Sequence, residues 1–218
     1  MKSINVVLIV MITLTLLAAP AGATMSYYSN QTSWEAATSN VFTIDFNDVA
    51  VPPSGFIDYS TTGVQLHDVT FTANPATEGG LQVGNLASGC YANAFGTGNY
   101  FLCGNTYDAK YFEAALPANV TAVAMNLLPS PYGNPVTLSF SSGDTQVIPA
   151  LPNTTPVFAG FVFGQPISSV RFESTSFFIG VDNFSYSQIE ETPEASTLLL
   201  AGAGLISLLL ARRLRRLC

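Results

Sequence analysis

The chain has 218 residues and a net charge of −7, with fourteen acidic residues against seven lysines and arginines. An acidic chain repels nucleic acid and anionic lipid, so we expect no nucleic-acid partner. One histidine and three cysteines are too few ligands to predict a zinc site.

The N-terminal end has the layout of a secretory signal peptide. Lys2 gives a short positive region, residues 4–17 form an apolar run, and Ala21-Gly22-Ala23 fits the small-x-small cleavage rule. We therefore expect residues 1–23 to be a signal peptide that is removed on export. An uncleaved transmembrane anchor is the alternative, but the apolar run is short for a span and a cleavage site follows it directly.

Residues 24–191 remain as the folded ectodomain, which has the length of a single domain. Every acid except Glu194 lies in this part, which makes thirteen against two bases, Lys110 and Arg171, so its net charge is −11. Carboxylates attract Ca²⁺. Scattered acids also commonly serve solubility alone.

A short helix is the first element expected in the ectodomain, beginning near Thr32. Thr32 and Glu35 have the spacing of a capping box, in which each side chain bonds the backbone of the other residue. We expect Trp34 to pack over one end of the core. Stacking of Trp34 on a sugar ring is the alternative.

From Val41 onward the chain predicts short strands separated by turns. Residues 64–72 alternate between apolar and polar, with a change of phase at His67-Asp68 that indicates a bulge. Residues 136–140 alternate with their apolar side chains inward, and a hairpin turn follows at 141–144. Further strands are expected at 41–47, 81–83, 100–102, 110–114, 120–128, 145–148, 158–163, 168–174 and 177–187.

This pattern predicts an all-β fold, a jelly-roll-like antiparallel β-sandwich with one short N-terminal helix. We expect the strand at 41–47 and the strand at 177–187 to lie close together.

Two cysteines flank a segment rich in glycine, asparagine and tyrosine. Cys90 and Cys103 are predicted to form a disulfide, because an exported protein meets an oxidising compartment. Aromatic rings and amide side chains near them have the character of a sugar-binding surface, with Tyr91, Tyr100 and Tyr107 as the candidate contacts. The alternative is that these tyrosines fill the end of the sandwich.

Acidic residues near both ends of the ectodomain predict a Ca²⁺ site. Asp45 follows the first expected strand, and Asp182 and Asn183 lie in the last one. If the two strands pair, carboxylate and amide oxygens from both can surround the ion. The alternative is that Asp182 and Asn183 form an Asx turn or a bulge beside Gly180.

The segment 192–218 has three parts. Pro193-Glu194-Ala195 is polar, residues 197–211 form an uncharged apolar run that predicts a transmembrane helix, and four arginines follow: Arg212, Arg213, Arg215 and Arg216. Arginines on one side of such a run stay on the cytoplasmic face. The run is short against the roughly 20 residues of a full span, which is typical of an anchor that a processing enzyme removes. A plain single-span anchor is the alternative.

This layout resembles the PEP-CTERM sorting signal, with Ala195 where the second proline usually stands. The resemblance implies export, a membrane-anchored intermediate, recognition by a membrane-embedded exosortase-like enzyme, and a final location at the cell surface or in the extracellular matrix. Bacteria that make exopolysaccharide use this signal.

The ectodomain also resembles other PEP-CTERM ectodomains near both of its ends. The matching stretches are 42–46, 63–64 and 69–71 near the start, and 161, 166–172 and 180–186 near the end. This resemblance implies a β-sandwich related in shape to carbohydrate-binding modules. It brings no established activity.

The residues do not assemble a catalytic constellation. His67 is the single histidine, and no G-x-S-x-G turn accompanies it. We therefore expect a non-catalytic surface or exopolysaccharide-matrix protein, of the kind found in biofilms, that binds extracellular polysaccharide. A glycosidase needs only two carboxylates at a suitable separation, so a secreted glycan-active hydrolase or esterase on the same scaffold is the alternative.

Overall fold

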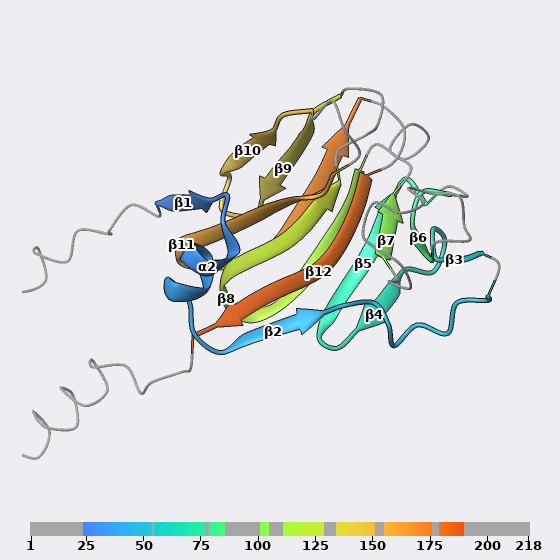
Figure 1. Ribbon diagram of the computed structural model, residues 1–218, viewed down its shortest axis with the longest axis horizontal. Coiled ribbons are helices and arrows are strands. Elements are labelled where there is room, and N and C mark those ends of the chain that lie inside the picture. The colour runs from blue at the N-terminus through green and yellow to red at the C-terminus, as the bar shows by residue number, and fades with distance from the viewer. Residues whose placement is uncertain are drawn as a thin grey trace, which may run out of the picture. The chain divides into compact units, whose positions relative to one another are not determined.

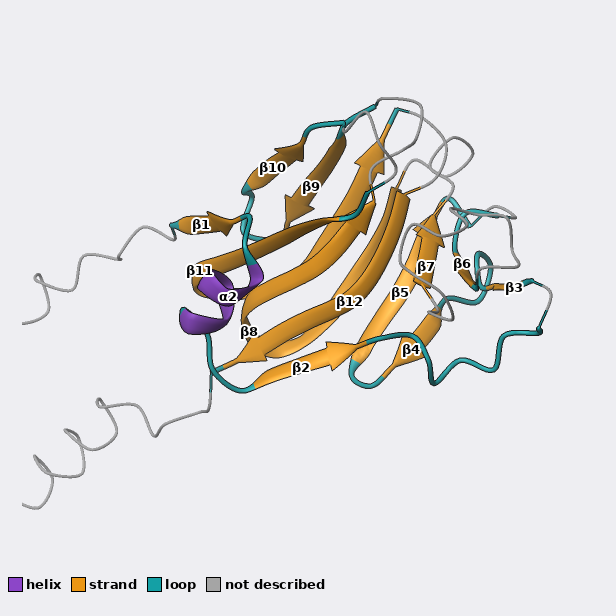
Figure 2. Cartoon of the chain, in the orientation of Figure 1, coloured by secondary structure: helices purple, strands orange, loops and turns teal. Residues whose placement is uncertain are grey.

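The computed structural model describes residues 24–53, 55–76, 79–85, 101–104, 111–128, 134–150, 155–175 and 179–189. The chain divides into two compact units, Met1–Gln188 and Ile189–Cys218, and the described elements belong to the first. Within the described ranges this unit consists of antiparallel strands and one short helix (Figure 1, Figure 2). No helix in those ranges is long and apolar enough to cross a membrane.

The elements follow one another along the chain with the helix after the first strand. They are β1 (Met25–Tyr28), α2 (Gln31–Ala36), β2 (Val41–Ile44), β3 (Phe56–Asp58), β4 (Val64–Leu66), β5 (Val69–Asn74), β6 (Gln82–Gly84), β7 (Phe101–Gly104), β8 (Tyr111–Leu128), β9 (Val136–Phe140), β10 (Thr145–Ile148), β11 (Val157–Ser174) and β12 (Ile179–Gln188).

Hydrogen bonds connect these strands into one continuous sheet that folds over into two layers. In the first layer the order is β4-β5-β8-β11-β9-β10, with the N-terminal half of β8 and the C-terminal half of β11. In the second layer the order is β1-β11-β8-β12-β2, with the other halves of β8 and β11. The strands β7, β6 and β3 continue the second layer beyond the start of β12.

The strands β8 and β11 therefore run through both layers. The register between them shifts from Val162 to Ile167, opposite a stretch of β8 in which Asn119 has a φ of 63°. Such irregularities bend a strand and increase its twist. The sequence analysis was wrong in dividing each of these elements into two strands, because a strand can continue through a bend when the pairing on both sides persists.

The two layers pack face to face over an apolar core, as the sandwich prediction requires. Phe71 of β5 meets Phe184 of β12 with ring centroids 5.4 Å apart, and Phe140 of β9 meets Phe161 of β11 at 4.8 Å. The predicted alternation of β9 is confirmed, since Val136, Leu138 and Phe140 are buried and the residues between them are half-exposed. The all-β sandwich is thus the fold of the domain.

The pairing of the first predicted strand with the last is also confirmed. Ile44 of β2 lies opposite Phe184 of β12. Two short strands were missed. β1 does not alternate in sequence and pairs with β11, and β3 has three residues and pairs with β6.

The predicted bulge at His67-Asp68 is instead a tight turn. Leu66 of β4 pairs with Val69 of β5, and His67 has a φ of 51° in the turn between them. A change of hydrophobic phase marks a turn as well as a bulge, so the pattern alone did not separate them.

The helix begins earlier than the capping box predicted. Asn30 is the N-cap, and its Oδ1 accepts a hydrogen bond from the Ser33 amide at 3.0 Å. Glu35 accepts a bond from Gln31 Nε2 at 2.7 Å and so does not pair with Thr32. Asparagine caps a helix as well as threonine does, and two possible caps stand close together in this sequence.

Trp34 does not cover an end of the core but packs on the outer face of the second layer. It forms a separate apolar cluster with Ala122 and Ala124 of β8. Its Nε1 donates to the Phe161 carbonyl at 3.2 Å, and its side chain is only 2% exposed. Small residues beneath the ring let the helix approach the strands, and Gly160 of β11 is one of them.

Candidate functional site

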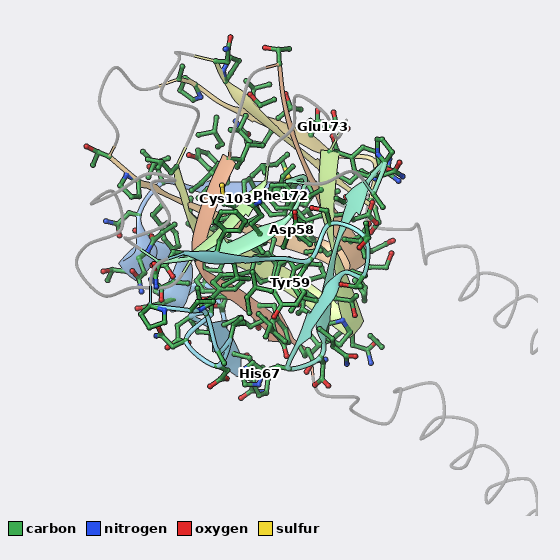
Figure 3. All side chains as sticks on the ribbon, turned by 90° about the vertical axis from the view of Figure 1, so that its right-hand side faces the viewer. Asp58, Tyr59, His67, Cys103, Phe172 and Glu173 are labelled. Carbon is green, nitrogen blue, oxygen red and sulfur yellow. The ribbon has the colours of Figure 1, made fainter. Side chains whose placement is uncertain are left out.

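Several predicted site residues lie outside the described residues. These are Cys90, Tyr91, Tyr100, Tyr107 and the sorting-signal residues Pro193, Glu194, Ala195, Arg212, Arg213, Arg215 and Arg216. Cys103 is described and is buried in β7; Figure 3 shows it within the body of the domain. The predicted disulfide and the predicted tyrosine surface stay predictions.

The structure does bring together the residues predicted for Ca²⁺. Asp45 follows β2, and Asp182 lies in β12, the strand with which β2 pairs. The carboxylates are close enough for the charge of Asp45 to raise the pKa of Asp182. In the part of the chain that the structure describes, no three His, Cys, Asp or Glu side chains gather into a metal-ligating group.

The bulge offered as the alternative is present at Asp182 and Asn183, and a separate Asx turn, which was not predicted, lies at Asp45. Asp45 accepts bonds from the Asn47 amide and from Asn47 Nδ2, at 3.1 and 2.8 Å, in an Asx turn. The register of β12 against β8 shifts between Asp182 and Ser185, and Asn183 has a φ of 50°. The metal prediction remains untested, because a bulge and a bound ion are compatible.

Asp182 is an unusual carboxyl group for a protein surface. It is 4% exposed, and burial raises its pKa from 3.8 to about 6, with a smaller contribution from Asp45. Its hydrogen-bond donors come from the next residue: the Asn183 backbone amide donates at 2.7 Å and Asn183 Nδ2 at 3.1 Å. The hydrogen bonds from Asn47 lower the pKa of Asp45. The bulge thus places one poorly solvated carboxyl beside one that ionises readily.

A pocket of about 220 Å³ opens on the outer face of the second layer, beside this bulge. Five elements line it: the helix α2 and the strands β2, β8, β11 and β12. Its lining residues are Gln31, Trp34, Glu35, Val41, Thr43, Asn126, Phe158, Asn183 and Ser185.

The polar lining comes from outward-facing positions of the strands. Thr43 and Ser185 face each other across the β2–β12 pair, with their hydroxyl oxygens 2.9 Å apart. Asn126 of β8 lies opposite Asp182 in the register, and the bulge turns Asn183 toward the same side. Alternation of a strand makes these positions point away from the core.

The helix supplies the remaining wall because Trp34 fixes it against the strands. The ring of Trp34 meets the ring of Phe158 edge-on, with centroids 6.2 Å apart. Gln31 and Glu35, one turn apart, are held together by their mutual hydrogen bond. The alternative that Trp34 stacks on a sugar is not supported, because its ring is buried; Phe158 also lines the pocket.

The lining has the chemistry of a site for a polar, uncharged ligand. Three carboxamides, from Gln31, Asn126 and Asn183, offer both donors and acceptors, and two hydroxyls do the same. Glu35 is the single carboxylate among the lining residues. The pocket is smaller than the roughly 300–1,000 Å³ of a typical small-molecule site, so it suits one unit of a larger molecule.

Sequence reasoning singled out Asn183, and Trp34 as an alternative sugar contact, but missed most of the other pocket residues. In the sequence these residues occupy ordinary solvent-facing positions of a helix or a strand: Gln31, Thr43, Asn126 and Ser185. Strand pairing brings Thr43, Asn126 and Ser185 together, and the packing of α2 over the strands adds Gln31. The small residues Ala122 and Ala124, which alternate in β8, were the signal in the sequence that something covers this face.

Comparison with known families decides the role of the C-terminal segment. Residues 191–216 match the PEP-CTERM protein-sorting motif. The chain carries a PEP-CTERM sorting signal. This signal implies export and processing by an exosortase-like enzyme, with a location at the cell surface or outside the cell, as the tail of the sequence predicted. The PEP-CTERM match covers the tail and does not extend into the sandwich.

Two solved structures resemble the chain at low similarity. The K1 cleaved adhesin domain of Lys-gingipain from Porphyromonas gingivalis W83 has 12% identity and a TM-score of 0.37, over 70% of this chain and 100% of that one. The CBM22-1 xylan-binding domain from Paenibacillus barcinonensis has 11% identity and a TM-score of 0.27, over 71% and 98%. Comparison with curated proteins gives no match.

Proposed function

We propose that this exported domain binds an uncharged extracellular polysaccharide without cleaving it, through the pocket between α2 and the second layer. The observation that carries the proposal is the convergence of three carboxamides, from α2, β8 and β12, on one pocket. Sugar hydroxyls are both donors and acceptors, and so are carboxamides. Phe158 offers an apolar surface for the C–H groups of a sugar ring.

Charge supports an uncharged ligand. The ectodomain has a net charge of −11, and Glu35 lines the pocket itself. The negative charge of the domain would repel polysaccharides that carry uronic acid or sulfate groups. A neutral glycan meets no such barrier, and Glu35 can accept a hydrogen bond from one of its hydroxyls.

The lining supports binding over hydrolysis. Both standard glycosidase mechanisms use two carboxyl groups across the scissile bond, and the pocket is lined by one. His67 lies in the β4–β5 turn, away from the pocket lining, with Nε2 3.5 Å from Asp48 Oδ2 and both side chains exposed. The alternative of a glycan-active hydrolase has no comparable support from the site.

Affinity electrophoresis of the exported protein tests the proposal. We expect retardation in gels that contain hydroxyethyl cellulose, galactomannan or dextran, for at least one of the three, and none in alginate. Asn126→Ala and Asn183→Gly should remove the retardation; glycine suits the φ of 50° at position 183. Gln146→Ala removes an amide from β10, far along the sheet order, and is the matched control.

Two results would contradict the proposal. Unchanged retardation in both pocket variants would place any binding elsewhere, for example on the tyrosine segment. Release of reducing ends from the retained polysaccharide would show the hydrolase instead.

The sorting signal adds a proposal about the fate of the protein. We infer that an exosortase-like enzyme removes the arginine cluster, so that the mature protein stays at the surface or in the matrix with its polysaccharide. Mass spectrometry of the protein from its native host should find no peptide containing Arg212–Cys218. An intact C-terminal Cys218 would indicate a plain membrane anchor.

A further inference from the structure

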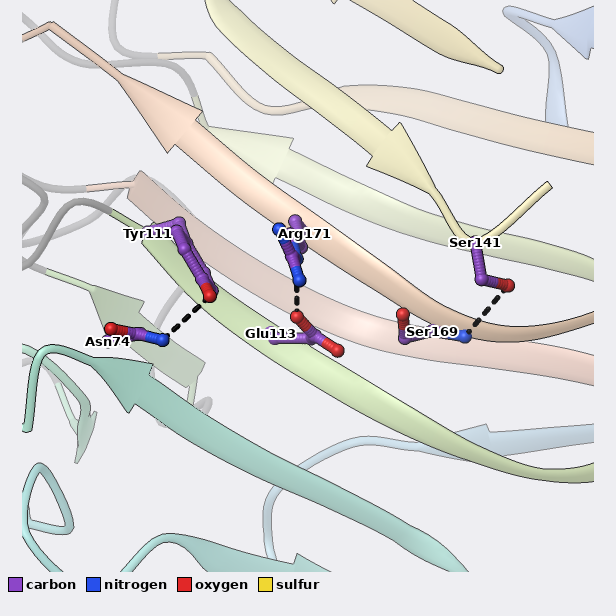
Figure 4. Close-up of polar contacts among 6 residues, drawn as sticks. All are labelled: Asn74, Tyr111, Glu113, Ser141, Ser169 and Arg171. Atoms are coloured by element: carbon purple, nitrogen blue, oxygen red, sulfur yellow. Dashed lines mark hydrogen bonds and ion pairs between the residues drawn. The ribbon is translucent and has the colours of Figure 1, made fainter. Parts of the chain in front are cut away.

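The outer face of the first layer carries a row of side chains that the pocket does not use. Asn74 of β5, Tyr111 and Glu113 of β8, and Arg171 of β11 lie side by side (Figure 4). They alternate along their strands with buried residues such as Phe112 and Phe172, so they point away from the core. We call these four residues the Tyr111 row.

Contacts within the Tyr111 row hold its side chains in place. Asn74 Nδ2 donates to the Tyr111 hydroxyl at 2.7 Å, and Arg171 Nε donates to Glu113 Oε2 at 2.6 Å. The Arg171 guanidinium carbon lies 4.5 Å from the centre of the Tyr111 ring. A ligand therefore meets an ordered surface and loses little side-chain entropy on binding it.

The Tyr111 row is accessible although it is ordered. The Arg171 side chain is 46% exposed and that of Glu113 is 23% exposed. A guanidinium has five N–H donors, and the bond to Glu113 uses the one at Nε. The guanidinium carbon lies over the tyrosine ring, and the bond at Nε does not engage the four N–H groups of the two terminal nitrogens.

Hydroxyl side chains extend this surface on both sides. Thr72 of β5 lies opposite Glu113, and Ser139 of β9 lies opposite Arg171. Ser141, which follows β9, accepts from the amides of Ser168 and Ser169 at 2.7 and 3.3 Å, and so ties the end of β9 to β11. Four neighbouring strands at about 4.8 Å spacing give a polar strip of about 14 Å, which spans several sugar units.

The charges of the Tyr111 row select the same class of ligand as the pocket. Arg171 is neutralised by Glu113, and Glu173 also lies on β11. An anionic ligand gains little from a paired guanidinium and meets a domain of charge −11. A neutral polysaccharide can stack on the planar guanidinium and bond the carboxamide, carboxylate and hydroxyls.

We propose that the Tyr111 row is a second polysaccharide-binding site and that the domain cross-links two glycan chains. This inference rests on the proposed function of the pocket. The pocket lies on the outer face of one layer and the Tyr111 row on the outer face of the other, and the two inner faces pack together in the core. The two sites therefore face away from each other and one polysaccharide chain cannot fill both by lying flat. Two sites of modest affinity then join chains through multivalency.

Isothermal titration of the exported protein with a short oligosaccharide from the retained polysaccharide tests this inference. We expect two oligosaccharides per protein, and the long polysaccharide should become turbid or gel when the protein is added. Arg171→Gln and Tyr111→Ala should leave one bound oligosaccharide and abolish gelation. Asn126→Ala should also leave one, at the Tyr111 row.

A conservative substitution separates loss of binding from loss of folding. Arg171→Lys keeps the positive charge but removes the planar guanidinium. We therefore expect at least tenfold weaker binding at this site with an unchanged melting temperature. Gln146→Ala on β10, whose register partner Leu138 is buried, is the control and should keep both sites.

The outcomes separate the two proposals. One oligosaccharide per protein, lost in Asn126→Ala and kept in Arg171→Gln, would overturn the second site and leave the pocket. One oligosaccharide, lost in Arg171→Gln and kept in Asn126→Ala, would overturn the pocket and cross-linking. Absence of binding to every neutral polysaccharide would overturn both proposals.

Discussion

The indole ring of Trp34 fills the space in which a side chain at position 160 would lie. A β-carbon on Gly160 would come within 2.6 Å of Trp34 Cδ1 and within 2.8 Å of Phe158 Cε1. The helix that carries three of the nine lining residues of the pocket is therefore fixed to the sheet by one large residue that lies over one small one.

Gly160→Ala should destabilise the domain and displace α2. The new methyl group must move a buried ring, and overpacking of this kind costs about 1–3 kcal/mol. Urea unfolding followed by tryptophan fluorescence measures the loss, because Trp34 is the only tryptophan in the chain. We also expect weaker polysaccharide binding, since Gln31 and Glu35 move with the helix.

Gly55→Ala is the matched control for that experiment. A β-carbon at Gly55 meets nothing within 4 Å, so we expect a change within about 0.5 kcal/mol. Equal stability of Gly160→Ala and the unmodified protein would show that Trp34 does not hold the helix in this way.

The buried carboxyl of Asp182 should make stability depend on pH. Burial raises its native pKa from 3.8 to about 6, so the native state binds the proton more tightly than the unfolded state. This contribution is fully present below about pH 4 and is lost as the pH rises through about 6. Asp182→Asn should therefore stabilise the domain at pH 7, by about 2 kcal/mol after allowance for solvent screening, and much less at pH 4.

Urea unfolding of the protein and the variant at pH 4 and pH 7, without divalent cations, measures this difference. Comparing the two proteins at each pH cancels the titration of other groups such as Asp45, whose lowered pKa acts in the opposite direction. The same difference at both pH values would show that Asp182 is not the buried acid.

If the predicted site exists, Ca²⁺ should offset the free-energy cost of burying the Asp182 carboxylate. An ion held by Asp45 and Asp182 binds the native state only, and it stabilises by about 2.7 kcal/mol at a hundredfold excess over its dissociation constant. A site of protein oxygens prefers Ca²⁺ over Mg²⁺, which sheds its water reluctantly. We expect a larger rise in melting temperature with Ca²⁺ than with Mg²⁺ at equal ionic strength.

Asp182→Asn should remove that preference and keep the screening effect common to both ions. Equal melting shifts with both ions, unchanged by the substitution, would show that Asp45 and Asp182 hold no Ca²⁺ and only form the turn and the bulge that the structure shows.

The predicted disulfide between Cys90 and Cys103 needs a test that does not depend on accessibility. Cys103 is 1% exposed, so it would resist alkylation in the native state even as a thiol. The exported protein should be unfolded without reductant and then alkylated; we expect no label on either cysteine until reductant is added. Cys103→Ser should cost about 2–4 kcal/mol of stability. Labelling of both thiols without reductant would exclude the bond.

The sequence predicted the sandwich because its strands alternate and its turns are well marked. Val136, Leu138 and Phe140 are an example, and the pairing of 41–47 with 177–187 is another. The gaps left in the two long strands, 115–119 and 164–167, contain Pro117 and Pro166, and proline is uncommon within central strands. Here each proline lies at a bend where the chain passes between layers.

The site was less predictable than the fold. Asp45 and Asp182 could be brought together by strand pairing alone, whereas the pocket depends on where α2 packs. Nothing in the sequence near Gln31 indicates that it faces Asn126 of β8. The Tyr111 row depends on the register of three strands in the same way.

Nuclear magnetic resonance of the exported protein tests the central claim most directly. The side-chain amide signals of Gln31, Asn126 and Asn183 can be followed while a neutral oligosaccharide from the retained polysaccharide is added. We predict saturable shifts of these signals and of the Trp34 indole N–H, with little change at Gln146 on β10. Saturable binding that leaves all three pocket amides unshifted would contradict the account.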